Sequence, residues 1–193
     1  MNNDEHQYNN QQWLRDASCR PSPNYNQRPD PSDISLLVVH NISLPAGEFA
    51  NGYIEQLFCN TLDCSAHPSF DSLRETAVSA HFLICREGFL NQFVALDQRA
   101  WHAGVSVFEG RENCNDFSIG VELEGTDDQA YTEQQYQMLA NLTKTLMQRY
   151  PLITVDRVVG HSDIAPGRKT DPGPAFDWQY FRRCLNNTDN GAS

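Results

Sequence analysis

The sequence predicts a single α/β domain of the α+β type, in which helices flank one central mixed β-sheet. Short apolar runs typical of buried strands occur at residues 34–40, 117–124 and 155–160. A helix with an apolar stripe lies between the last two runs, and residues 78–85 and 89–95 are separated only by Arg86-Glu87-Gly88, which is a hairpin signal. A hairpin together with a helix between two strands predicts a mixed sheet.

The size and composition of the chain fit one domain. It has 193 residues, 39% hydrophobic residues and a formal net charge of −11, and no apolar run approaches the roughly 20 residues that span a bilayer. The acidic charge argues against nucleic acid and anionic membrane as partners, because both favour a basic surface. The first residues lack the features of a secretory signal, so we expect a cytoplasmic monomer with six reduced cysteines.

We divide the chain into a polar N-terminal arm (1–33), the domain (34–186) and a C-terminal tail (187–193). The arm is rich in Asn, Gln, Asp and Pro and lacks periodicity, so we expect a coil with extended Pro-containing pieces. Apolar spacing predicts a helix over residues 48–60. Residues 61–75 lack periodicity, and we expect a long loop that borders the substrate and is the candidate moving part.

The predicted strand at residues 117–124 alternates apolar and polar side chains. The alternation places Glu122 and Glu124 on the same face, and periodicity does not show which of them reaches a catalytic site. Carboxylates on a strand most often belong to a solvated face.

Two helices have clear signals at their ends. The helix expected at residues 132–150 begins with Thr132 as N-cap and has Gln135 at the capping-box position. Asp177 is the expected N-cap of a final helix.

The segment 159–174 has the composition of a functional loop. His161 follows an apolar strand, and the loop after it holds Asp163, Lys169 and Asp171 among several Gly and Pro residues. Because Gly and Pro fix turns, these side chains are expected to keep nearly constant relative positions, as a metal or catalytic site requires.

A catalytic zinc site usually takes three protein ligands, so a further ligand is needed beyond this loop. His40 is the best candidate, because it also ends an apolar run and ligands gather outside the carboxyl ends of strands in α/β sheets. A histidine at a strand end is more often structural, and spacing alone leaves both interpretations open. It also leaves Asp163 and Asp171 as rival ligands.

Four segments closely resemble the zinc-dependent N-acetylmuramoyl-L-alanine amidases. They are His40-Asn41-Ile42-Ser43, Arg99-Ala100-Trp101-His102-Ala103-Gly104, residues 115–127 and residues 160–174. The resemblance covers about residues 15–186 and is closest to the cytosolic branch that acts on 1,6-anhydro-muropeptides. It implies one Zn²⁺ per chain, a small-molecule muropeptide substrate, and hydrolysis of the amide between the lactyl group of the muramic acid and L-alanine in peptidoglycan recycling.

The resemblance also implies roles for individual residues. It places the zinc ligands on His40, His161 and Asp171, so that Asp163 is a turn residue. It makes Glu122 the catalytic acid/base and Lys169 the cation that stabilises the developing oxyanion.

Positions that contact substrate in the family fall on Asn41, Trp101 and His102, and Trp101 would offer an apolar face to a sugar ring. Two positions that carry substrate-binding cations in close relatives fall on the uncharged Ala77 and Asn113. The candidates to replace these cations are Arg74, Arg111 and Arg168. We expect the remaining histidines His67 and His81 to be structural.

Two other functions compete with this prediction. One is a general amidase that acts on intact cell wall, and the other is a non-catalytic peptidoglycan-recognition module. The second is disfavoured because a metal ligand or the acid/base would be expected to be missing from such a module, whereas all of them are present here.

Overall fold

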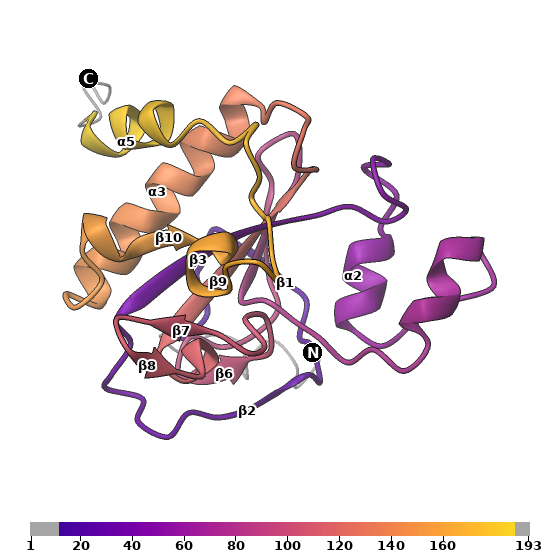
Figure 1. The fold of residues 1–193 in the computed structure, drawn as a ribbon, viewed down its shortest axis with the longest axis horizontal. Helices are drawn as coiled ribbons and strands as arrows, with labels where there is room; N and C mark the ends of the chain where they lie inside the picture. Colours follow the sequence, from indigo (N-terminus) through magenta and orange to yellow (C-terminus); the bar gives the residue numbers. More distant parts are fainter. Residues whose placement is uncertain (1–11, 188–193) are drawn as a thin grey trace, which may run out of the picture.

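The centre of the molecule is a six-stranded mixed sheet with the strand order β1-β5-β4-β9-β3-β10 (Figure 1). The computed structural model describes residues 12–187. The strands are β1 (Ser18–Cys19), β5 (Leu90–Gln92), β4 (Phe82–Ile84), β9 (Ser118–Glu124), β3 (Leu36–Ile42) and β10 (Val158–Gly160). Neighbouring strands from β4 to β10 are parallel, whereas β5 is antiparallel to β4. The predicted mixed sheet is therefore confirmed.

Two small ribbons and several helices surround this sheet. The ribbons pair β2 (Tyr25–Gln27) with β6 (Gln98–Ala100), and β7 (Val107–Phe108) with β8 (Arg111–Glu112). The helices are α2 (Tyr53–Phe58), α3 (Glu133–Arg149), α4 (His161–Ile164) and α5 (Trp178–Asn186), with 3₁₀ turns η1 (Pro68–Leu73), η2 (Cys114–Asp116) and η3 (Val155–Arg157). In Figure 1, α3 and α5 lie together, away from α2. No helix within residues 12–187 is long and apolar enough to cross a bilayer.

The two faces of the sheet have different partners. On β3, Leu37 and Val39 point into the core that contains the buried residues of α3 and α5. Leu36 and Val38 belong to a separate core on the opposite face. Since side chains alternate along a strand, His40 lies on this second face, and its partner in the register of β9 is Glu122. The face that α3 leaves uncovered therefore carries both residues.

Local signals predicted several elements accurately. The hairpin of β4 and β5 is present, with Gly88 at φ 83°. Thr132 and Gln135 form the expected capping box of α3, and Asp177 accepts a hydrogen bond from the Tyr180 backbone as the N-cap of α5. These signals involve residues that are close in sequence, so the structures that they predict form without depending on distant segments.

Three other segments differ from the prediction in the length or the type of their secondary structure. The helix expected over residues 48–60 is only α2, because Ala50 and Gly52 have positive φ and interrupt it. Residues 61–75 are not a plain loop, since they contain η1. The strand expected over residues 155–160 begins as the turn η3, and only β10 is extended.

The predicted arm is not a free coil. Its strands β1 and β2 pair with β5 and β6, and Arg28 is only 4% exposed. The prediction was wrong for these residues because buried polar side chains such as Ser22 and Asn24 bind backbone groups of the domain instead of solvent. The rest of the predicted arm (1–11) and nearly all of the predicted tail (188–193) lie outside the described residues.

Candidate metal centre and active site

Three side chains that are far apart in sequence meet at the carboxyl ends of β3 and β10. These strands are parallel neighbours, with Val39 opposite Gly160, so His40 on β3 lies beside His161 at the start of α4. The two Nδ1 atoms are 2.9 Å apart, and each is 3.0 Å from Oδ2 of Asp171. Among residues 12–187, this is the group of His, Cys, Asp and Glu whose ligand atoms converge as a metal site requires.

The donor set fits zinc. Zinc binds imidazole and carboxylate ligands at about 2.0–2.2 Å in a tetrahedron, which separates ligand atoms by about 3.3 Å. The observed spacing of 2.9–3.0 Å is close to this value. His40 and His161 are 1% and 2% exposed, so the ligands lie in a largely dry environment. The rival ligand Asp163 is engaged elsewhere, because its carboxylate accepts the Gly160 backbone N–H at the start of α4.

Hydrogen bonds on the far side of both imidazoles hold Nδ1 toward the metal position. His161 Nε2 donates to the carbonyl oxygen of Ala103 at 3.0 Å. His40 Nε2 lies 2.9 Å from His102 Nδ1, and His102 Nε2 lies 3.2 Å from the Ser118 hydroxyl. With His40 as donor to His102, and His102 as donor to Ser118, every ring nitrogen has a partner. Such outer contacts fix the tautomer of a metal-binding histidine.

The protonation states also suit metal binding. Burial lowers the pKa of His40 to about 4, and the contact with Asp171 only partly opposes this effect. Burial alone would raise the pKa of Asp171, but its hydrogen bonds with His161 and His40 outweigh burial and bring the pKa well below its usual range. At neutral pH the centre therefore presents a neutral His40 and a charged carboxylate.

Glu122 lies beside this centre with an unusual carboxyl group. It is 9% exposed, and its Oε2 is buried without a hydrogen-bond partner among the described residues. Burial raises its pKa well above the usual value, the charge of Asp171 adds to this effect, and Lys169 opposes it. An unpaired buried carboxyl group with a raised pKa is characteristic of a catalytic acid/base.

The second glutamate on the same face has a structural role. Glu124 accepts hydrogen bonds from the backbone N–H groups of Ala50 and Arg86, at 2.6 and 3.1 Å. Both of its carboxyl oxygens are thus occupied. The structure distinguishes Glu122 from Glu124 by this pairing, which the alternation of the strand does not reveal.

A pocket of about 230 Å³ opens over the metal centre. It is lined by His40, Asn41, Ile42, Phe58, Val78, Ser79, Trp101, His102, Glu122, His161, Lys169 and Asp171. A second hollow of about 560 Å³ shares Asn41, Ile42, Lys169 and Asp171 with it. All the predicted site residues therefore line one pocket, and Lys169 borders both hollows.

The three predicted substrate contacts have different surroundings. Asn41 donates to the carboxylate of Asp127 at 2.8 Å, and the Trp101 indole donates to Asn26 at 2.6 Å, so both side chains are held in place. Both ring nitrogens of His102 already have partners, as described above. The predicted contact of His102 with substrate stays a prediction. The sequence did not predict the hydrogen bond between His102 and His40, although His102 belongs to the conspicuous Trp-His-Ala-Gly segment.

The candidate replacements for the missing cations are all engaged. Arg74 pairs with Asp71 at 2.7 Å, and Arg111 with Asp33 at 2.5 Å. Arg168 donates to the backbone carbonyls of Ala103 and Val105, at 2.6 and 2.7 Å. Among the residues that line the pocket over the metal centre, the cation is Lys169.

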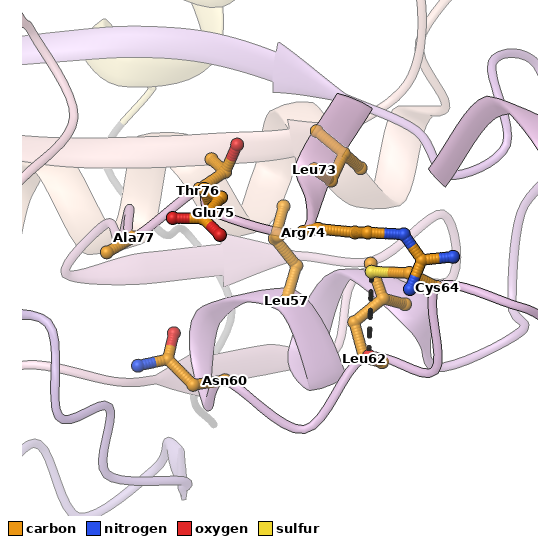
Figure 2. Close-up of a pocket in the computed structure, with 9 residues that line it drawn as sticks. All are labelled: Leu57, Asn60, Leu62, Cys64, Leu73, Arg74, Glu75, Thr76 and Ala77. Atoms are coloured by element: carbon orange, nitrogen blue, oxygen red, sulfur yellow. Dashed lines mark hydrogen bonds between the residues drawn. The ribbon is translucent and has the colours of Figure 1, made fainter. Parts of the chain in front are cut away.

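Ala77 borders a separate hollow of about 290 Å³ between α2 and η1 (Figure 2). The hollow is lined by Leu57, Asn60, Leu62, Cys64, Leu73, Arg74, Glu75, Thr76 and Ala77. Figure 2 shows the Arg74 guanidinium beside Cys64, at the opposite end from Ala77. The predicted loop 61–75 thus forms much of the wall of this hollow, and its proposed motion stays a prediction.

Comparisons with known proteins agree with this geometry. Residues 30–174 match the sequence model of a family described as N-acetylmuramoyl-L-alanine amidase. The chain is 59% identical over 173 residues to the 1,6-anhydro-N-acetylmuramyl-L-alanine amidase AmpD of Salmonella typhimurium, covering 90% of this chain and 92% of the relative. The AmpD of Escherichia coli is 58% identical over 172 residues, with 89% and 93% covered.

Solved structures give the same result. A selenomethionine crystal structure of AmpD superimposes with a TM-score of 0.88 at 56% identity, over 91% of this chain and 98% of that one. The amidase AmiD of Escherichia coli, in complex with anhydro-N-acetylmuramic acid-L-Ala-D-γ-Glu-L-Lys, has a TM-score of 0.60 at 30% identity. That match covers 79% of this chain and 57% of AmiD. The similarity thus includes the whole region that carries the metal centre.

Proposed function

The chain belongs to the N-acetylmuramoyl-L-alanine amidase family, and we propose that it hydrolyses the amide between the lactyl group of 1,6-anhydro-N-acetylmuramic acid and L-alanine. The relatives named AmpD, at 52–59% identity, support this substrate. We place the reaction in cytoplasmic peptidoglycan recycling. We also propose that a monomer is the functional unit, because the predicted metal, catalytic and substrate-binding residues of one chain already line a single pocket.

The observation that carries the proposal is the position of Glu122. Glu122 lies opposite His40 in the sheet register and lines the same pocket as the three proposed metal ligands, and its Oε2 has no hydrogen-bond partner in the part of the chain that the structure describes. A recognition module would gain nothing from a buried, unpaired carboxyl group, which costs about 1–3 kcal/mol of stability. A hydrolase requires such a group to transfer protons.

We assign one zinc ion to Nδ1 of His40, Nδ1 of His161 and Oδ2 of Asp171. When bound there, zinc supplies a Lewis acid and lowers the pKa of water to about 7. The protein contributes the two imidazoles, the charged Asp171 and the outer hydrogen bonds that orient both rings.

Glu122 moves the proton during hydrolysis. The oxygen of water bonds to the lactyl carbonyl carbon, and the bond from that carbon to the nitrogen of L-alanine breaks. Glu122 accepts a proton from the attacking water and then donates it to the departing nitrogen. Burial raises the pKa of Glu122, which strengthens the carboxylate as a proton acceptor relative to an exposed glutamate.

Lys169 and Trp101 act on other parts of the substrate. The ammonium group of Lys169 borders the pocket and stabilises negative charge that develops on the carbonyl oxygen. The Trp101 indole, held by Asn26, offers its apolar face to the sugar ring. Asn41, held by Asp127, contributes an amide for the substrate backbone.

The test is product detection by mass spectrometry. The zinc-loaded protein is incubated with 1,6-anhydro-muramoyl tripeptide and, in parallel, with the same peptide on a non-anhydro sugar. We expect cleavage mainly of the anhydro compound. Equal cleavage of both would indicate a general cell-wall amidase, and no cleavage with zinc confirmed bound would indicate a recognition module.

A further inference from the structure

Arg28 is a buried arginine that lies behind the metal centre. It is 4% exposed and follows β2, within the segment that composition predicted as a coil. Burial lowers its pKa to about 10, so it stays charged at neutral pH. Within residues 12–187 it has no carboxylate partner. It donates to four backbone carbonyls, those of Leu96, Asn115, Asp116 and Ser118, and its guanidinium also lies 2.9 Å from His81 Nε2. Burying a cation in this way is costly, which indicates that the contacts serve a specific arrangement.

One branch of these contacts leads to His40. Arg28 donates to the Ser118 carbonyl at 2.7 Å, and the Ser118 hydroxyl accepts the Nε2 proton of His102 at 3.2 Å. His102 in turn accepts the Nε2 proton of His40 at 2.9 Å. The His102 ring also packs on Gly120, where a β-carbon would come within 2.5 Å of the ring. Gly120 thus leaves room for the ring to pack directly against the backbone of β9.

A second branch leads to His161. Arg28 donates to the Asn115 carbonyl at 3.1 Å. The Asn115 side chain accepts the backbone N–H groups of His102 and Ala103, at 3.1 and 2.8 Å. The carbonyl of Ala103 accepts the Nε2 proton of His161 at 3.0 Å.

We propose that Arg28 is a positioning residue of the metal centre, which fixes the orientation of both histidine ligands through Ser118 and Asn115. Either branch alone would orient a single ligand. The Arg28 guanidinium, which has several donors in a fixed geometry, binds the backbone carbonyls of Ser118 and Asn115 and so begins both branches. This inference rests on the metal centre proposed above. It gives the N-terminal segment a part in zinc binding.

The test compares Arg28→Lys with Arg157→Lys. Arg157 is the control, because it also donates to a backbone carbonyl, that of Ser35 just before β3, but its other hydrogen-bonding partner is Glu109, and no contact with the proposed ligands occurs within residues 12–187. Zinc affinity of the folded apoprotein is measured by competition with a chromophoric chelator. We expect Arg28→Lys to bind zinc roughly 10–100-fold more weakly, the loss typical of outer contacts of a metal site, and Arg157→Lys to bind as the wild type does.

A spectroscopic measurement separates positioning from general stability. ¹⁵N NMR of the zinc-loaded protein should show His102 protonated only at Nε2 in the wild type and in Arg157→Lys, but as mixed tautomers in Arg28→Lys. If Arg28→Lys does not fold, Ser118→Ala and Asn115→Ala provide a second test. Each of these variants removes one branch and should weaken zinc binding. Wild-type affinity in Arg28→Lys, or in both branch variants, would overturn the inference. Failure of the wild type to bind zinc would instead overturn the proposed function.

Discussion

At the scale of single residues, variants of the proposed metal ligand Asp171 and of the proposed acid/base Glu122 should have different phenotypes. Asp171→Ala removes one of three ligands, so we expect zinc and activity to be lost together. Glu122→Gln keeps the shape of the side chain and all three ligands, so zinc should remain while turnover falls by about 10²–10⁴-fold. Zinc content by atomic absorption and initial rates on the anhydro substrate measure both effects. Retained zinc in Asp171→Ala, or normal rates in Glu122→Gln, would show that these assignments are wrong.

Glu122 should also reduce the stability of the protein at neutral pH. Its pKa in the folded state is raised above the usual 4.5 by burial, so the stability that the protonated form contributes is present below pH 4.5 and is lost as pH rises through the folded pKa. We therefore expect Glu122→Gln to be more stable than the wild type by about 1–3 kcal/mol at pH 8. The difference should shrink at pH 4.5.

Urea unfolding of the metal-free proteins at the two pH values measures this difference. Glu124→Gln provides the control, because both Glu124 oxygens accept backbone hydrogen bonds and its loss should destabilise the protein. A gain for Glu122→Gln that does not depend on pH would argue against titration of this carboxyl group as its cause.

At the scale of elements, the start of α3 is the local feature with the clearest energetic consequence. The Thr132 hydroxyl accepts the Gln135 backbone N–H at 3.1 Å and donates to the Arg86 carbonyl at 2.6 Å. We expect Thr132→Ala to lower the free energy of unfolding by about 1–2 kcal/mol with little effect on turnover. Thr145→Ala, at an exposed site within α3, should change it by less than about 0.5 kcal/mol. Equal effects of the two variants in urea unfolding would contradict the capping role.

The predictability of each element follows from the range of the interactions that form it. The cap of α3 and the β4–β5 hairpin depend on neighbouring residues, and the sequence predicts both. The start of α2 depends on positive φ at its N-cap Gly52 and at Ala50, and alanine is a residue type that gives no such signal. The pairing of β1 and β2 with distant strands also leaves no periodicity in a polar segment.

At the scale of the whole molecule, the metal centre depends on strand order and register. Spacing alone suggested His40 and His161, and the resemblance to the amidases selected Asp171. The contact of His102 with His40 and the support from Arg28 could not be predicted, because they depend on which segments cross behind β3 and β9. Sequence patterns identify residues that face the substrate more readily than the buried residues that hold them in place.

The N-terminal segment should stabilise one wall of the active site through Asn24. Its buried amide donates to Asn60 and to the carbonyl of Val78, each at 2.8 Å, and its backbone carbonyl accepts the Ser79 hydroxyl. Val78 and Ser79 line the catalytic pocket. Asn24→Ala leaves buried polar groups unpaired, so we expect a loss of about 1–3 kcal/mol in the free energy of unfolding and a higher KM with a smaller change in kcat.

Urea unfolding and steady-state kinetics on the anhydro substrate test this expectation, with hydrogen exchange at Val78 as the local measurement. Asn141→Ala is the control, because Asn141 is exposed on α3, away from the pocket. Exchange at Val78 should accelerate in Asn24→Ala and stay unchanged in Asn141→Ala, since only Asn24 binds this wall. Wild-type exchange and KM in Asn24→Ala would mean that the wall is held by the packing of α2 on β4 and not by the N-terminal segment.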